Sequence, residues 1–439
     1  MVDRRSFITA FAGGLWASRP WAGARATSGL QESARHAWLF VLPLIELAAL
    51  RARPTANDGK PTPINVLRHG RALAGPKSRA VTTPNNDTLY STAFVDTTKG
   101  PVRLELPDCN GRYLSVQLTD MYTNNNFILS PRTPGRSPGV WRLLSPDSHP
   151  RDARELRLAT PHAWLTVRIL VKGQADLPAL HTIQDRVGLE GPAFPPPSNA
   201  ATRTSDWPAY FAAAQQLLES DPPPFKNGLD AFIRVRDAGG RGDFSRASYA
   251  PEAAAAIDAG VAEAAAIGDT VRLRQRFVDG WTYPRPDLGD FGDNFVFRAI
   301  VAMVGLGALT PAEAMYMRAQ GDGHGLFTGD ELYRFNLSGP VPVDGFWSLT
   351  MYKPTGDGQF FLTDNPLMRY SIGDRTEGLI RGPGGALDIW IGRSDPGGER
   401  TANWLPAPRA GPFALTFRAY LPRPELLGGM YRLPSIARV

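Results

Sequence analysis

Two clusters of polar and aromatic side chains could take part in chemistry. The first lies in the N-terminal half and combines amides, carboxylates, tyrosines and an arginine: Asn85, Asn86, Asp87, Tyr90, Arg112, Tyr113 and Asp120. The second lies near the C-terminus and contains Trp347, Arg369 and Tyr370. Because amides both donate and accept hydrogen bonds and aromatic rings offer flat apolar faces, this combination suits a hydroxyl-rich ligand. The sequence therefore predicts a binding site for a small polar or sugar-like ligand.

The same residue types also have a structural interpretation. Asn and Asp in turns hydrogen-bond their own backbone, and Trp and Tyr fill the cores of β-sandwiches. The first cluster is the more informative one, because five polar or polar-tipped positions fall within the six residues 85–90. An apolar strand does not need such a density of polar groups.

An enzyme is the second hypothesis, most simply a metal-independent hydrolase or lyase. Asp87 or Asp120 would act as acid or base, and Arg112 would stabilise negative charge. The catalytic residues stay unknown, because the six histidines are scattered and no glycine-rich nucleotide motif follows a strand. The sequence therefore predicts no metal and no cofactor. Convergence of the two aspartates and Arg112 on one cavity would favour the enzyme.

Short strands position the first cluster. Residues 89–95, 101–106, 112–120 and 164–171 alternate between apolar and polar side chains, which predicts an all-β sandwich. In an antiparallel meander, the loop 85–87 before the first strand and the residues 124–126 after the third lie at opposite ends. We therefore expect the loop 85–87 to face a cleft that it shares with the C-terminal domain, near Trp347 or Arg369.

Helices are predicted before and after this sandwich. Residues 31–53 have helical spacing with a kink at Pro43. Four more helices are predicted over residues 206–219, 229–236, 251–275 and 294–306. The capping box Thr310–Glu313 predicts the start of another helix. Closely spaced strands then indicate a C-terminal sandwich or jelly roll, over residues 333–337, 345–352, 387–391 and 413–420.

Long stretches of the chain resemble one bacterial family. The segments PNNDTLYS, GRYLSVQLTDMYTNN, GFWSLTMYKP and GPFALTFRAYLP are similar to exported proteins in which domain of unknown function 1254 precedes domain of unknown function 1214. The resemblance covers most of residues 30–439. It implies a mainly β fold with a helical insertion: an immunoglobulin-like β-sandwich, a central helical region and a jelly-roll-like β-sandwich. The family brings no assigned reaction with it.

The expected organisation has five parts. Residues 1–26 are expected to form a twin-arginine-type signal peptide, and residues 27–75 an N-terminal helix and linker. The sandwich that resembles domain of unknown function 1254 is expected over residues 76–195. A helical region over residues 196–325 and the jelly-roll-like domain over residues 326–439 complete the chain.

The first residues indicate export. Arg4-Arg5-Ser6-Phe7-Ile8 resembles a twin-arginine motif, and a short apolar run and the cleavage site Ala24-Arg25-Ala26 follow. The predicted location is therefore periplasmic or secreted. Removal of this segment takes away four arginines and one aspartate, which lowers the formal net charge from +6 to +3.

Composition narrows the possible partners. No basic cluster typical of nucleic-acid binding remains after signal removal, and no apolar run is long enough for a transmembrane segment. Cys109 is the only cysteine, so the chain cannot form an intramolecular disulfide. A small polar ligand is the predicted partner, and assembly into a homo-oligomer stays open.

Overall fold

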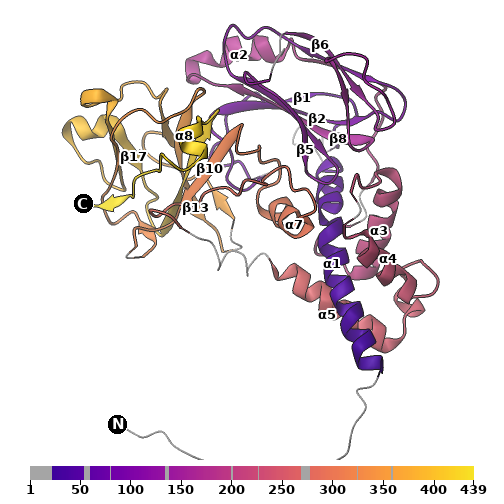
Figure 1. Cartoon of the computed structure of the whole chain (residues 1–439). Helices are drawn as coiled ribbons and strands as arrows, with labels where there is room; N and C mark the ends of the chain where they lie inside the picture. Colours follow the sequence, from indigo (N-terminus) through magenta and orange to yellow (C-terminus); the bar gives the residue numbers. More distant parts are fainter. Residues whose placement is uncertain are drawn as a thin grey trace, which may run out of the picture.

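The computed structural model describes residues 22–53, 60–79, 81–133, 138–198, 201–225, 227–267, 277–323, 325–356 and 359–439. These residues form a mixed fold of several β-sheets and a group of helices (Figure 1). The expected combination of β structure with helices is thereby confirmed. The immunoglobulin-like and jelly-roll topologies stay predictions. The twin-arginine motif lies outside the described residues.

Two sheets form the N-terminal β domain. The larger one has five strands in the order β1 (Arg68–His69), β2 (Thr88–Asp96), β8 (His162–Leu170), β4 (Leu114–Asp120) and β5 (Asn125–Leu129). The smaller one has the order β7 (Glu155–Arg157), β6 (Gly139–Leu144), β3 (Val102–Leu106) and β9 (Gly188–Glu190). The main strands lie within about two residues of their predicted positions.

The pairing register decides which residues of the five-stranded sheet share a face. Val116 and Val167 are directly paired and belong to the core between the two sheets. Tyr90 pairs with Arg168, and Arg168 pairs with Ser115. Because side chains alternate along a strand, this second set points away from that core.

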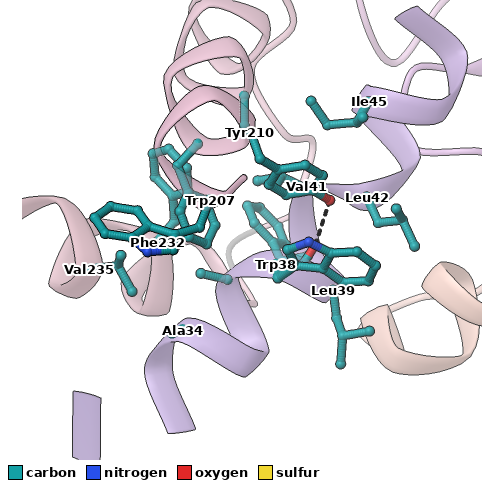
Figure 2. Close-up of a cluster of buried hydrophobic side chains, with 14 of the residues drawn as sticks. Ala34, Trp38, Leu39, Val41, Leu42, Ile45, Trp207, Tyr210, Phe232 and Val235 are labelled. Carbon is teal, nitrogen blue, oxygen red and sulfur yellow. Dashed lines mark hydrogen bonds between the residues drawn. The ribbon is translucent and has the colours of Figure 1, made fainter. Parts of the chain in front are cut away.

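Helix α1 (Ala22–Arg51) is the central helix of a second core, among α3 (Trp207–Ser220), α4 (Leu229–Ala238), α5 (Pro251–Ala265) and α7 (Phe295–Val304). Figure 2 shows Trp38 against Tyr210, whose ring stacks at 5.3 Å and whose hydroxyl donates a hydrogen bond to the Trp38 carbonyl oxygen at 3.0 Å. Gly260 permits the close contact of α5 with α1, since a Cβ there would lie 2.2 Å from the Gln31 carbonyl oxygen.

The segment Ser28–Arg51 is long and apolar enough to cross a membrane. In the structure, however, 72% of its apolar window is buried inside the protein. It packs against α3, α4, α5 and α7 as the core of the helical region. Its apolar composition is therefore explained by packing.

The prediction of a helix that begins at Thr310 is wrong. Glu313 closes a turn onto the Thr310 carbonyl oxygen, and strand β10 (Ala314–Ala319) follows. β10 pairs along its whole length with β18 (Pro412–Tyr420). Tertiary pairing therefore overrides the local capping signal. The helix predicted over residues 251–275 corresponds to α5, which ends at Ala265. Its predicted end, Gln275, lies outside the described residues.

Two sheets form the C-terminal domain. One has the order β10, β18, β13 (Trp347–Pro354) and β14 (Phe360–Phe361), to which β11 (Phe327–Thr328) and β15 (Ser371–Gly373) add. The other has the order β17 (Trp404–Pro406), β16 (Leu387–Gly392), β12 (Tyr333–Leu337) and β19 (Ala437–Arg438). The apolar residues of β10, β13 and β18 point into the core of this domain. The polar residues of these strands therefore lie on the opposite face of the sheet.

Candidate functional site at the junction of the two β domains

Part of the outer face of the five-stranded N-terminal sheet packs against the polar face of β10, β13 and β18, and we call this junction the interdomain face. The part of the outer face that carries Phe94 and Trp164 packs against the helical core instead. The amide nitrogen of Asn85 donates to the Tyr420 hydroxyl at 2.7 Å. The Tyr352 hydroxyl donates to the Pro84 carbonyl oxygen at 2.8 Å. Tyr113 packs edge-on against both Phe346 and Tyr420. Residues distant in sequence thus build one buried polar layer.

Asp87 is tied to the C-terminal domain. Its side chain is 1% exposed, and its two carboxylate oxygens accept hydrogen bonds from Ser348 Oγ at 2.6 Å and Arg375 Nη2 at 2.9 Å. Arg375 also lies over the Phe346 ring at 4.4 Å. The loop 85–87 therefore contacts the C-terminal domain at the residue next to Trp347, and the shared cleft expected there stays a prediction.

Arg418 is a buried cation of β18 and is 3% exposed. Its guanidinium donates to Thr350 Oγ1 at 3.0 Å, the Tyr352 hydroxyl at 2.7 Å and the Thr83 carbonyl oxygen at 3.0 Å. These acceptors are all neutral. Arg418 therefore has hydrogen-bond partners but no ion pair among the described residues.

Arg168 is a second buried cation, from β8, and is 4% exposed. Its Nη2 donates to the Gly307 carbonyl oxygen at 2.8 Å, and its guanidinium lies over the Tyr90 ring at 5.2 Å. Within the described part of the chain, its Nη1 has no hydrogen-bond partner and its side chain makes no ion pair. The guanidinium of Arg168 thus makes fewer hydrogen bonds than that of Arg418.

Several further polar atoms of the interdomain face are buried without a hydrogen-bond partner in the described structure. They are Thr88 Oγ1, Ser115 Oγ, Thr166 Oγ1, Gln117 Oε1, Arg375 Nε and Thr416 Oγ1. Thr166 and Gln117 are directly paired and lie on the Arg168 face of their sheet, and Thr416 lies on the Arg418 face of β18. Similar atoms elsewhere belong to Arg51, Thr123, Trp141 and Arg298.

A carboxyl group also lies in this layer. The Tyr113 hydroxyl donates to Glu313 Oε1 at 2.6 Å, and both side chains are buried. Burial raises the pKa of the Glu313 carboxyl, and burial together with the Glu313 charge raises the pKa of Tyr113. The charges of Arg132 and Arg168 act in the opposite direction and lower the pKa of Glu313.

The other predicted residues of the first cluster have separate environments. Asn86 donates to the Ala74 carbonyl oxygen, and Arg112 forms a bidentate pair with Asp176 at 2.5 and 2.7 Å. Asp120 accepts hydrogen bonds only from the turn that follows it, residues 122–126. The structure therefore does not bring Asp87, Asp120 and Arg112 together.

The second predicted cluster is not one site either. Trp347 stacks on Phe417 at 5.2 Å inside the C-terminal core. Arg369 donates to the carbonyl oxygens of Ala402 and Trp404 at 2.9 Å each. Tyr370 is half-buried, and partial burial raises its pKa. The expectation that the loop 85–87 lies near Arg369 has no contact to support it in the described structure.

The sequence reasoning missed four of the residues that dominate the interdomain face: Arg168, Arg375, Arg418 and Tyr420. Arg168 and Arg418 each lie two residues after a threonine, at alternate positions of a strand whose other face is apolar. This alternation is a signal for a face distinct from the core. It does not tell whether water or another domain covers that face.

Known proteins resemble this chain over nearly its whole length. The VPA0106 protein from Vibrio parahaemolyticus has 21% sequence identity and a TM-score of 0.68, over 94% of this chain and 100% of its own. An uncharacterized protein from Burkholderia cenocepacia has 12% identity and a TM-score of 0.47, over 97% and 92% of the two chains. No curated protein matches the chain. The first likeness supports the fold alone.

Two family descriptions match this sequence, and both match in the expected order. "Protein of unknown function (DUF1254)" covers residues 64–191, and "Protein of unknown function (DUF1214)" covers residues 313–424. The first range contains the five-stranded sheet, and the second contains most of the C-terminal domain, so the interdomain face lies between the two. The chain belongs to the family of proteins that carry these two domains.

Proposed function

We propose that this protein binds a small polar molecule between its two β domains. The observation that carries the proposal is the set of buried hydrogen-bonding atoms without partners on the interdomain face. Each such atom costs about 1–3 kcal/mol when it is left unpaired, so a layer with several of them is unfavourable without a further partner. A polar ligand would supply that partner.

The placement of these atoms fits a binding site better than a packing defect. Thr166 and Gln117 come from the N-terminal sheet and Thr416 from the C-terminal one, so a molecule between the sheets would contact both domains. Tyr90 and Tyr316 of the same two faces keep part of their surface accessible. Polar groups that converge at a domain boundary are a usual arrangement for small-molecule sites.

A binding role fits these contacts better than the alternative, a metal-independent hydrolase or lyase. That enzyme would need Asp87 or Asp120 beside Arg112. Asp87 instead forms an ion pair with Arg375, and Arg112 forms one with Asp176. Asp120 accepts hydrogen bonds from the turn that follows it. Each side chain thus has a structural task that would compete with acid–base chemistry. On the sequence signals alone, we also propose that binding takes place outside the cytoplasm, after twin-arginine export.

Thermal unfolding and native mass spectrometry test the proposal. Protein purified without denaturant would be analysed for a co-purified small molecule, and a panel of sugars, polyols and organic acids would be screened for compounds that raise the melting temperature. The double variant Thr166→Val with Thr416→Val should lose this ligand response. It should unfold near the parent temperature without ligand, because neither hydroxyl has a hydrogen bond to lose.

Thr98→Val is the control for ligand response, since Thr98 is exposed in the turn after β2. Its stability without ligand is compared separately, because this variant loses a hydrogen bond to Asp96. It should keep the full ligand response. The proposal is overturned if the native protein carries no small molecule and no compound of the panel stabilises it. It is equally overturned if the double variant responds to ligand as the parent does.

A further inference from the structure

We infer that the ligand carries an oxyanion, a carboxylate or phosphate group that Arg168 recognises. This inference rests on the proposed function, because it assumes a molecule between the two β domains. The reason is charge: Arg168 is buried, cationic and without an ion-pair partner among the described residues. An arginine stays protonated in such a place, so its charge has to be met by something other than the loss of a proton.

The acidic groups near this layer are already committed. Asp87 uses both oxygens on Ser348 and Arg375. Glu313 accepts from Tyr113 and forms no ion pair with Arg168 in the described structure. Arg168 itself contacts the Gly307 carbonyl oxygen and the side chain of Tyr90. The described protein therefore supplies a hydrogen bond and an aromatic contact to this cation, but no ion pair.

Water cannot complete such a site on its own. A bridging water satisfies a hydroxyl or an amide well, because those groups need only a hydrogen-bond partner. A buried guanidinium also needs compensation of its charge, and an unpaired buried charge is the more costly of the two. A carboxylate or phosphate oxygen supplies both, and Arg–oxyanion hydrogen bonds are about twice as strong as neutral ones.

The neighbours of Arg168 indicate a second chemical group that the ligand should carry. Thr166 lies two residues away on the same face and offers a hydroxyl that can donate to the same oxyanion. Gln117 pairs with Thr166 in the sheet, and its unpartnered atom is the acceptor Oε1, since its nitrogen donates to the Ala308 carbonyl oxygen at 3.2 Å. An acceptor there calls for a donor on the ligand. The predicted class is therefore a hydroxylated carboxylic acid or a sugar phosphate.

Pairs of compounds that share a polyol or sugar skeleton, of which one member carries an oxyanion group, test this class. The probes are glycerate and glycerol 3-phosphate against glycerol, and glucuronate and glucose 6-phosphate against glucose. Binding would be measured by thermal shift and calorimetry with the full chain. Charged members should bind and their neutral partners should not, and the carboxylate and phosphate arms identify which oxyanion is preferred.

Arg168→Met should weaken binding of the charged probe about tenfold or more, because a charge-assisted hydrogen bond is lost. Its melting temperature without ligand should equal or exceed that of the parent, since an uncompensated buried charge is removed. Arg168→Lys, which keeps the charge but not the planar fork, should bind with intermediate affinity. The exposed Arg381→Met is the control and should bind normally.

The outcomes separate this inference from the proposed function. Equal binding of neutral and charged members, unaffected by Arg168→Met, would leave the binding function in place and overturn the oxyanion. Charged probes that bind Arg168→Met as tightly as the parent would also overturn the role of Arg168. If no probe binds, and crystals soaked in glycerate or glycerol 3-phosphate show only water at Arg168 Nη1, both proposals fail.

Discussion

Asp87 and Arg375 form an ion pair that joins the two β domains, with 2.9 Å between Arg375 Nη2 and Asp87 Oδ1. The two residues are 288 positions apart in the sequence, and the second oxygen of Asp87 is held by Ser348. The turn before β2 is therefore fixed by the opposite domain as much as by its own backbone. This contact makes the loop 85–87 part of the interdomain face.

We expect Asp87→Ala to lower the free energy of unfolding by about 1–3 kcal/mol, because it removes the acceptor of Ser348 and of Arg375 Nη2 and leaves Asp374 as the remaining ion-pair partner of Arg375 among the described residues. Arg375→Met should be costly for the same reason. The double variant should lose less than the sum of the two single losses, since both singles break one interaction. Urea denaturation of the parent, the singles and the double variant measures this coupling.

Asp185→Ala provides the comparison for this cycle. Asp185 pairs with Arg71 at the surface, where an ion pair contributes at most about 1 kcal/mol. If Asp87→Ala cost no more than Asp185→Ala, the carboxylate would matter only to its own turn. An additive double variant would likewise contradict the ion pair as a link between domains.

His162 should make stability depend on pH. Its ring lies between Asp221, at 2.9 Å, and Asp96, at 3.3 Å. Burial alone would lower the pKa of His162, but hydrogen bonds to Asp221 and Asp96 raise it to about 9. Burial alone would raise the pKa of Asp96, but hydrogen bonds from His162 and Thr98 lower it to about 2. The buried Arg51 is a further cation near both carboxylates.

The signs of the two shifts define a pH window. The contribution of His162 is complete below its ordinary pKa of 6.5 and is lost as the pH rises through about 9. The contribution of Asp96 is complete above its ordinary value of 3.8 and is lost as the pH falls through about 2. Stability from this group should therefore be greatest between these two ordinary values. His162→Gln should remove the alkaline decline in a pH series of urea melts, and an unchanged decline would contradict the assignment.

Strand positions could be predicted from the sequence because each main strand carries its own alternation. In β2 and β8, side chains that face the core alternate with side chains that face away from it, and this alternation can be recognised within the strand's own sequence. Helix α1 was recognisable in the same way from its apolar spacing. The prediction failed at Thr310–Glu313, where the pairing of β10 with β18 prevails over a local capping box.

The candidate site could be predicted only in part, because its residues meet through the packing of two domains. Asp87 could be recognised because five of the six residues 85–90 are polar or polar-tipped. Its partner Arg375 lies in a segment without a comparable run of polar residues. Arg168 and Arg418 look like solvent-facing positions of half-buried strands, since alternation identifies a face and not what covers it. Only the contact between the two sheets turns them into buried cations.

The export hypothesis has its own test, since residues 1–21 lie outside the described structure. Arg4→Lys combined with Arg5→Lys should leave the precursor in the cytoplasm, because the paired arginines are the expected recognition element. Cell fractionation and N-terminal sequencing of the mature protein would measure this, with a start near Thr27 in the parent. Arg19→Lys lies outside the pair and should be exported normally. Unchanged periplasmic yield of the double variant would contradict a twin-arginine route.

Asp120 should prove to be a structural residue. It is fully buried, and its oxygens accept from the backbone nitrogens of Tyr122 and Asn124 at 2.9 Å and from the side-chain amides of Asn124 and Asn126 at 3.0 Å. Asp120→Asn keeps the shape but replaces one acceptor with a donor that faces other donors. We expect a loss of about 1–3 kcal/mol in the free energy of unfolding, with an unchanged dependence on urea concentration. Ligand binding by the folded variant should be unaffected, because these contacts belong to one turn. A variant as stable as the parent that no longer binds ligand would instead place Asp120 in the site.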